Sequence, residues 1–319
     1  MIERRHFLVL AAALAFGPAA AQQIDEVHFL IGSSPGSGWD QTARAVGQAL
    51  QDSGIAGTTS FENIPGGAGA KAVARLTETA DRQQNTLLVA STPVLIYGLQ
   101  GAIGYSWNDL TPVAAVIGDY EALAVRADSE LADFSAVVEK LQGDVRSVKI
   151  GGGSVVGSMD HLVAALAFKE AGLDALQMNY IPYAGGGAAM AALLSGEIDL
   201  LSTGLGEALE QQRQGQIRII GSTATTSVGG VPTLTEQGYP VEFVNWRGFF
   251  AAPGVDAEIV NAQAAAIDAM NDTGIWAEIR YRNGWVDIYY PGADFTAFLE
   301  DQENQVRTLM NELGIETKN

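Results

Sequence analysis

The feature that most limits the fold is a repeated order of apolar strand, glycine-rich bend and helix. It first appears where the apolar run Val27–Ile31 leads through a bend into a segment with Ala43, Val46 and Leu50 on one helical face. The same order recurs after four further strands that we expect at Ser60–Ile64, Val148–Ile150, Tyr180–Tyr183 and Ile198–Ser202. This alternation predicts an α/β fold with mostly parallel sheets, in which ligands bind at the carboxyl ends of strands, where these bends lie.

Apolar strands in the middle and late parts of the chain indicate two lobes. We expect one pass between lobes at Val113–Ile117 with Ala122–Val125, and a second at Val244–Ala252. Two passes would form a hinge with a ligand cleft between the lobes. The expected boundaries place residues 22–122 with 248–319 in lobe 1, and residues 123–247 in lobe 2.

Residues 1–21 have the pattern of a secretory signal peptide. Arg4 and Arg5 precede the apolar run Phe7–Phe16, which is too short to anchor a protein in a bilayer, and three alanines ending at Ala21 offer a cleavage site. The twin arginines leave both the general and the twin-arginine export routes open. We therefore expect an exported, periplasmic protein that is cleaved near Ala21.

The composition excludes several classes of function. Cysteine is absent, which rules out disulfides, thiolate catalysis and cysteine-based metal sites. Beyond the signal only His28 and His161 remain, too few for a zinc site. The formal net charge of −19 argues against nucleic acid or an anionic membrane surface as a partner. We expect no metal and no cofactor.

Residues 32–36 have the G-x-S-x-G spacing of a hydrolase nucleophile elbow, with Ser34 as the candidate nucleophile. In that motif the residue after the serine donates its N–H to the oxyanion hole. Here that residue is Pro35, which has no N–H. We therefore expect no catalysis, and an exported serine hydrolase is the least favoured alternative. Carboxylate pairs such as Glu207 and Glu210 are expected on a solvated helix face.

Serine, threonine and glycine residues cluster where strands end and helices begin. Unpaired N–H groups and the positive end of the helix dipole make such bends anion sites without lysine or arginine. Each serine could instead be only an N-cap, so the binding interpretation requires several bends to meet at one cleft. The residues concerned are Ser33, Ser37, Gly38, Ser91, Thr92, Ser154, Gly157, Ser158, Gly185–Gly187, Thr203 and Gly204.

Eight short motifs in order resemble those of the substrate-binding proteins of tripartite tricarboxylate transporters, also called the Bug family. They cover nearly all of the chain beyond the signal, and Trp39 with the W-R-G triplet is similar to the tricarboxylate-binding branch. The motifs lie at Ser33–Asp40, Glu62–Gly69, Trp107–Val113, Gly157–Leu162, Pro182–Ala188, Ser195–Asp199, Val231–Gly238 and Trp246–Gly248.

The resemblance implies a two-lobed periplasmic binding protein of the Venus flytrap type, similar to type II. Such a receptor closes on a small tri- or dicarboxylate and delivers it to the integral membrane permease of the transporter. A receptor of the same fold that serves a sensor kinase or another transporter is the alternative, and a monomer suits either role. The identity of the carboxylate stays open.

Carried over residue by residue, the resemblance implies a ligand site shared by the two lobes. Arg247, at the expected hinge, could fork onto a carboxylate or could form a structural ion pair. Trp39 could cover the ligand or pack its helix onto the sheet, and we expect His161 to pack behind the site. The implied ligand-binding residues besides Arg247 are Ser33, Pro35, Gly36, Ser37, Gly38, Trp39, Ser91 and Thr92 in lobe 1, and Ser154, Gly157, Ser158, Tyr183, Gly186, Gly187 and Thr203 in lobe 2.

Overall fold

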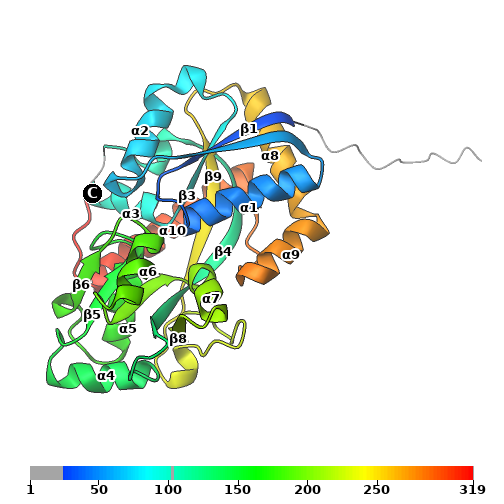
Figure 1. Cartoon of the computed structure of the whole chain (residues 1–319). Helices are drawn as coiled ribbons and strands as arrows, with labels where there is room; N and C mark the ends of the chain where they lie inside the picture. The colour runs from blue at the N-terminus through cyan, green and yellow to red at the C-terminus, as the bar shows by residue number, and fades with distance from the viewer. Residues whose placement is uncertain (1–23, 102–103, 319) are drawn as a thin grey trace, which may run out of the picture.

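The computed structural model describes residues 24–101 and 104–318, so the expected signal peptide lies outside the described residues. Figure 1 shows two α/β halves joined by long strands. The strands are β1 (Ile24–Ile31), β2 (Ala56–Asn63), β3 (Thr86–Ser91), β4 (Thr111–Arg126), β5 (Lys149–Gly152), β6 (Asn179–Pro182), β7 (Leu200–Gly204), β8 (Ile217–Ser222), β9 (Val244–Ala251) and β10 (Tyr290–Pro291). The helices are α1 (Gly38–Asp52), α2 (Ala70–Glu78), α3 (Pro93–Gln100), α4 (Phe134–Gly143), α5 (Met159–Glu170), α6 (Gly186–Ser195), α7 (Leu205–Arg213), α8 (Ala257–Asn271), α9 (Gly274–Asn283) and α10 (Gly292–Glu312).

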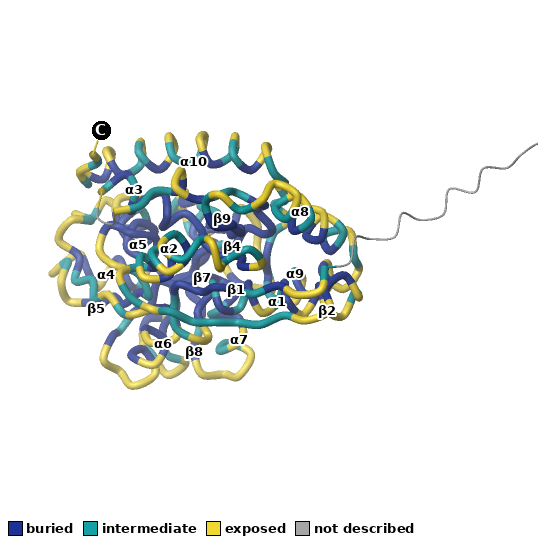
Figure 2. The backbone as a smooth tube through the Cα atoms, turned by 90° about the horizontal axis from the view of Figure 1, so that it is seen from above, coloured by how far each residue is buried: buried dark blue, intermediate teal, exposed yellow. Residues whose placement is uncertain are grey.

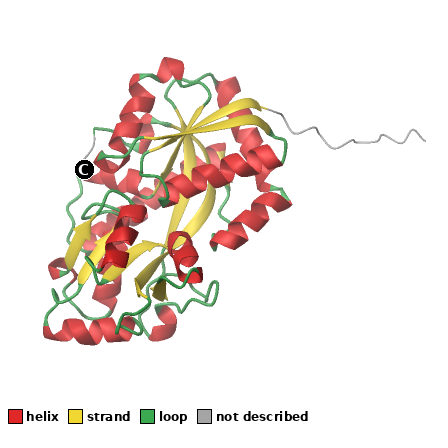
Figure 3. Cartoon of the chain, viewed as in Figure 1, coloured by secondary structure: helices red, strands yellow, loops and turns green. Residues whose placement is uncertain are grey.

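The two halves have closely related strand orders. In the first half the order is β2-β1-β3-β9-β4, with β1 parallel to both β2 and β3 and with β9 antiparallel to β3 and β4. In the second half β5 runs parallel to β6 and β7, while β4 pairs antiparallel with β7 and β8. The sheets are therefore mixed but mostly parallel, and helices flank the strands of both halves (Figure 3). The expected α/β class is confirmed.

The first expected pass between halves is one continuous strand of 16 residues, β4, rather than two short strands. Its first part pairs with β9 and its last part with β7 and β8, so β4 belongs to both halves. Gly118 lies in the middle, where an added Cβ would come within 2.7 Å of Ile288, Val244 and Val286. A glycine is needed here because larger side chains would collide with these neighbours. The division that we propose, residues 22–122 with 248–319 against residues 123–247, cuts β4 and β9.

Alternating burial places helices on both faces of the first sheet. Val27, Phe29 and Ile31 of β1 pack with α1, α8 and α9, whereas Leu30 packs with α2, α3 and α10. Figure 2 shows the buried strands enclosed between these more exposed helices. Among the described helices, none has both the length and the apolar character that crossing a bilayer requires.

Candidate functional site

A cavity of about 380 Å³ lies where the carboxyl ends of five strands meet. Gly32 follows β1, Ser91 ends β3, Gly153 follows β5, Pro182 ends β6 and Thr203 lies at the end of β7, and all five residues line the cavity. Strands of both halves contribute, as the position of the glycine bends predicted. The cavity is therefore the site where several helix starts converge.

The loop after β1 is shaped by Asp40 in the first turn of α1. Its carboxylate accepts hydrogen bonds from the Gly36 N–H (2.9 Å), from Asn63 Nδ2 (3.0 Å) and from Arg44 Nε (2.9 Å). Burial alone would raise the pKa of Asp40, but these hydrogen bonds hold it below its ordinary value. Ser37 is the N-cap of α1, and its hydroxyl accepts from the Asp40 N–H. Asp40 thus fixes the bend that faces the cavity.

The loop after β5 repeats the spacing of the loop after β1. Ser154, Gly157 and Ser158 stand at the same intervals as Ser33, Gly36 and Ser37. Both glycines have a φ of +82°, a backbone conformation that glycine adopts readily, and both second serines cap a helix. The Ser154 hydroxyl accepts from the Asp160 N–H at 3.0 Å. Each half therefore presents one loop of this form to the cavity.

The expected ligand-binding residues divide into two groups. Ten line the cavity: Ser33, Ser37, Gly38, Trp39, Ser91, Ser154, Tyr183, Gly186, Thr203 and Arg247. Six lie around it and are not among its lining residues: Pro35, Gly36, Thr92, Gly157, Ser158 and Gly187. The residues of the second group lie in the bends and at the helix starts next to the cavity.

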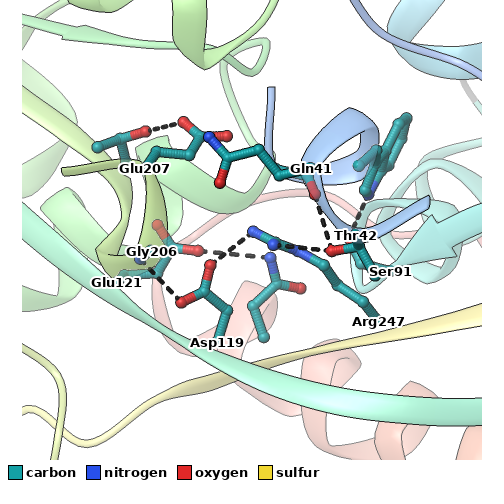
Figure 4. A network of polar contacts seen from close by, with 12 residues as sticks. Gln41, Thr42, Ser91, Asp119, Glu121, Gly206, Glu207 and Arg247 are labelled. Carbon is teal, nitrogen blue, oxygen red and sulfur yellow. Dashed lines mark hydrogen bonds and ion pairs between the residues drawn. The ribbon is translucent and has the colours of Figure 1, made fainter. Parts of the chain in front are cut away.

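Arg247 forms a structural ion pair, which is one of the two roles expected for it. Its Nη2 donates to Asp119 Oδ2 at 2.6 Å and its Nη1 to Thr42 Oγ1 at 3.1 Å, and Figure 4 shows the guanidinium between these two partners. Arg247 and Asp119 are both buried. Burial raises the pKa of Asp119, and the Arg247 charge together with the Gly206 N–H partly offsets this effect. The pair joins β9 to β4 at the base of the cavity.

The indole ring of Trp39 and the imidazole of His161 both pack against neighbouring residues of the fold. Trp39 Nε1 donates to Ser91 Oγ at 2.9 Å, and an added Cβ at Gly32 would lie 3.2 Å from its ring. Trp39 therefore connects α1 to β3 and also lines the cavity. His161 meets Tyr180 edge to face at 5.0 Å, and burial lowers its pKa to about 4, so the ring is neutral near pH 7.

Sequence reasoning missed an acidic group on the cavity wall, formed by Glu121, Asp160 and Glu207. The expectation of a solvated Glu207 is wrong, although Glu210 in the same helix is indeed exposed. Glu207 lies in the first turn of α7, where its Oε2 accepts from Thr203 Oγ1 at 2.6 Å (Figure 4). The preference of acidic residues for first turns could have singled it out.

The Glu207 carboxylate lies between the starts of α1 and α6. A Cβ built at Gly186 would be 1.8 Å from Glu207 Oε2, and one built at Gly38 would be 2.9 Å from Oε1. The two glycines therefore let a carboxylate approach two helix N-termini at once. The positive ends of helix dipoles favour an anion at such a position, and here the anion is the Glu207 carboxylate.

Burial raises the pKa of each carboxyl group in the acidic group. For Glu121 burial is followed by repulsion from Asp160 and Asp119, and its pKa lies well above its ordinary value. Burial and the Glu207 carboxylate raise the pKa of Asp160 to about 7. Burial likewise raises the pKa of Glu207 itself. The acidic group therefore holds protons more tightly than exposed carboxylates do.

The geometry around Ser34 does not form a nucleophile elbow. Its hydroxyl donates to the Ala184 carbonyl at 2.9 Å, and no histidine within the described ranges hydrogen-bonds to it. This bond connects the loop after β1 to the loop after β6 across the cavity. A second bond between halves runs from Gln100 Nε2 to the Gly157 carbonyl. The halves are thus in contact around the cavity.

Residues 24–101 and 104–318 contain no cluster of three or more potential metal ligands.

Comparison with known proteins gives consistent matches. The family model described as tripartite tricarboxylate transporter family receptor matches residues 43–315. Protein BugT of Bordetella pertussis is 28% identical over 263 residues, which cover 80% of this chain and 78% of that protein. The structures of the periplasmic binding protein BugD and of R. palustris Rpa4515 with adipate each superpose with a TM-score of 0.82 at 19% identity, covering 92% of this chain and 98% of theirs. These likenesses show the periplasmic binding protein fold.

Proposed function

The chain belongs to the tripartite tricarboxylate transporter receptor family, and from this premise we propose that it binds a small di- or tricarboxylate and delivers it to a membrane permease. The family consists of solute receptors, which confirms the expectation that the chain is not an enzyme. The carboxylate class is supported by the similar structure solved with adipate, a dicarboxylate. Membership of this family also supports our proposal of a membrane permease as partner and of the periplasm as location.

One observation carries this proposal: starts of helices from both halves meet at the cavity. Ser37 and Gly38 begin α1, and Gly185 with Gly186 begins α6, and all four line the cavity. The first N–H groups of a helix have no partner within the helix. The Glu207 carboxylate accepts from the Gly38 N–H, and the N–H groups that it leaves without a partner are available to an anion. The hydroxyls of Ser33 and Ser91 add donors beside them. A carboxylate can therefore be bound through backbone dipoles and hydroxyls.

The mechanism of binding follows from the division of the site between halves. Each half alone offers only part of the contacts, so a ligand that touches both favours the form in which they are close. Closure also excludes water, which strengthens the charge-assisted hydrogen bonds to the carboxylate. The contacts of Ser34 with Ala184 and of Gln100 with Gly157 are of the kind that stabilise a closed form. The permease would then distinguish the closed receptor from the open one.

Thermal melting of the purified protein against a panel of solutes tests the proposal. The panel comprises mono-, di- and tricarboxylates, neutral sugars and inorganic cations. A ligand at about 100 times its dissociation constant should stabilise the fold by roughly 2.7 kcal/mol and raise the melting temperature by several degrees. A shift limited to carboxylates is the expected result. A response to sugars or cations alone would overturn the proposal.

A further inference from the structure

Three carboxyl groups line one wall of the cavity, and no free cation among the described residues lies beside them. Glu121 comes from β4, Asp160 from the first turn of α5 and Glu207 from the first turn of α7. Within the described part of the chain Arg247 is the one basic residue that lines the cavity, and Asp119 already neutralises it at 2.6 Å. A solute with carboxylates only would therefore add negative charge beside these carboxyl groups, which is costly to bury without a cation.

The same wall holds buried acceptors that lack donors. Asn245 on β9 is 6% exposed, and its Nδ2 donates to Glu121 Oε1 at 3.4 Å. This bond leaves Asn245 Oδ1 without a hydrogen-bond partner among the described residues, and the Oε2 of Glu121, a residue that is 1% exposed, also has none there. Buried polar atoms are paired in the great majority of cases, so these two atoms indicate a donor on the occupant of the cavity. An amide oxygen remains an acceptor at any pH near neutrality, and no donor among the described residues reaches Asn245 Oδ1.

We propose that the solute carries a protonated amine as well as a carboxylate, and that Glu121, Asp160 and Asn245 form the subsite for the amine. This inference rests on the proposed function and narrows its substrate class to amino acids in the broad sense. A primary ammonium has three N–H donors and one positive charge, which match two acceptors without partners and an acidic wall. A quaternary ammonium has the charge but no donor, so it fits less well.

The remaining lining residues suit the other end of such a solute. The hydroxyl donors available to a carboxylate belong to Ser33 and Ser37 in the loop after β1, which also hydrogen-bond to each other, and to Ser91 at the end of β3. The acceptors come from β4, β9 and α5. Donors and acceptors thus arise from different elements, and a solute with separated charges can contact both sets. Its two charged groups then set its orientation in the cavity.

Proton exchange gives this subsite a second signature. The pKa of Asp160 is raised to about 7 by burial and by Glu207, and Glu121 is repelled by Asp160 and Asp119. Without ligand, these two carboxyl groups are therefore partly protonated near pH 7. A bound ammonium favours their ionised forms, whereas a further carboxylate favours their protonated forms. Binding of an amino acid should therefore release protons, and binding of a simple dicarboxylate should take them up.

Titration calorimetry with matched pairs of solutes tests the subsite. The pairs are succinate with aspartate and glutarate with glutamate, which differ only in one ammonium group, and N-acetylaspartate serves as the probe whose amine is neutralised. At pH 7 we expect at least one amino acid to bind ten times more tightly than its partner, and acetylation to abolish the gain. Titrations in two buffers of different ionisation enthalpy should show proton release for the amino acid.

The variant Glu121→Gln should lose the preference within a pair, while the control Glu210→Gln, on the exposed face of α7, keeps the preference. Equal or tighter binding of the dicarboxylates overturns the amine subsite and leaves the carboxylate receptor standing. If no member of either pair binds and a neutral sugar does, both the amine subsite and the carboxylate receptor are overturned. If Glu121→Gln does not fold, the five solutes titrated against the unaltered protein decide the question.

Discussion

Arg247 Nη2 and Asp119 Oδ2 are 2.6 Å apart, between the two strands that connect the halves of the molecule. Asp119 faces Asn245 in the register of β4 and β9, two positions from Arg247. Thr42 and the Gly206 N–H also hydrogen-bond to the pair, while Arg247 Nε has no partner among the described residues. Through these bonds the buried charge pair connects β4, β9, α1 and α7 beneath the cavity.

Removing one member of this pair should be strongly destabilising. The change Asp119→Asn leaves the Arg247 guanidinium buried without a counter-charge, and we expect a loss of about 3–5 kcal/mol in the free energy of unfolding. Urea unfolding followed by circular dichroism measures this loss. The control Asp128→Asn breaks an exposed pair with Arg126 and should cost about 0–1 kcal/mol. Similar losses in both variants would contradict the structural role of Arg247.

A methyl group at Gly186 should disturb ligand binding more than it disturbs the fold. Its Cβ would collide with the Glu207 carboxylate at 1.8 Å, and that carboxylate is the end of a flexible side chain that can move away. In Gly186→Ala we expect Glu207 to leave Thr203, and affinity for the best carboxylate of the panel to fall at least tenfold. The matched control is Gly187→Ala, whose Cβ would meet only the Pro35 carbonyl at 3.4 Å, an ordinary contact. Calorimetric affinities that are equal in the two variants would refute this account.

Ser34 should contribute to closure and not to catalysis. Its hydroxyl bond to the Ala184 carbonyl joins the two halves, and a hydrogen bond of this kind contributes about 0.5–1.5 kcal/mol. Ser34→Ala should therefore weaken ligand binding by roughly two- to tenfold, with no ester turnover in either protein. In the control Ser195→Ala the lost bond lies within α6, so affinity should not change. Ester hydrolysis that disappears in Ser34→Ala would instead establish the hydrolase alternative.

Asp160 should make the unliganded protein less stable as pH rises from about 4 to about 7. Burial and Glu207 raise its folded-state pKa from 3.8 to about 7, so in this range the folded chain holds a proton that the unfolded chain has lost. The change Asp160→Asn removes this dependence. Its melting temperature should exceed that of the unaltered protein by more at pH 8 than at pH 4.5. A difference that does not vary with pH would mean that Asp160 is ionised at both values.

Local signals predicted much of the fold and part of the site. The strand, bend and helix order is read from side-chain periodicity and glycine, which act over a few residues, and the helix that begins at Gly38 was expected from them. The serines at the bends were likewise visible, and ten of the sixteen expected residues line the cavity. Sequence left two roles open for Arg247, because the choice depends on Asp119, its partner 128 positions away.

The sequence by itself thus determined the α/β class, the glycine bends and the helix starts that offer N–H donors, since each of these depends on neighbouring residues. Only the tertiary structure decided the charge of the cavity. Glu121, Asp160 and Glu207 belong to three separate elements, and the first-turn positions of Asp160 and Glu207 do not reveal that these carboxyl groups meet each other and Glu121. They become an acidic wall because β4, α5 and α7 meet in the fold, where low solvent access makes their mutual repulsion large.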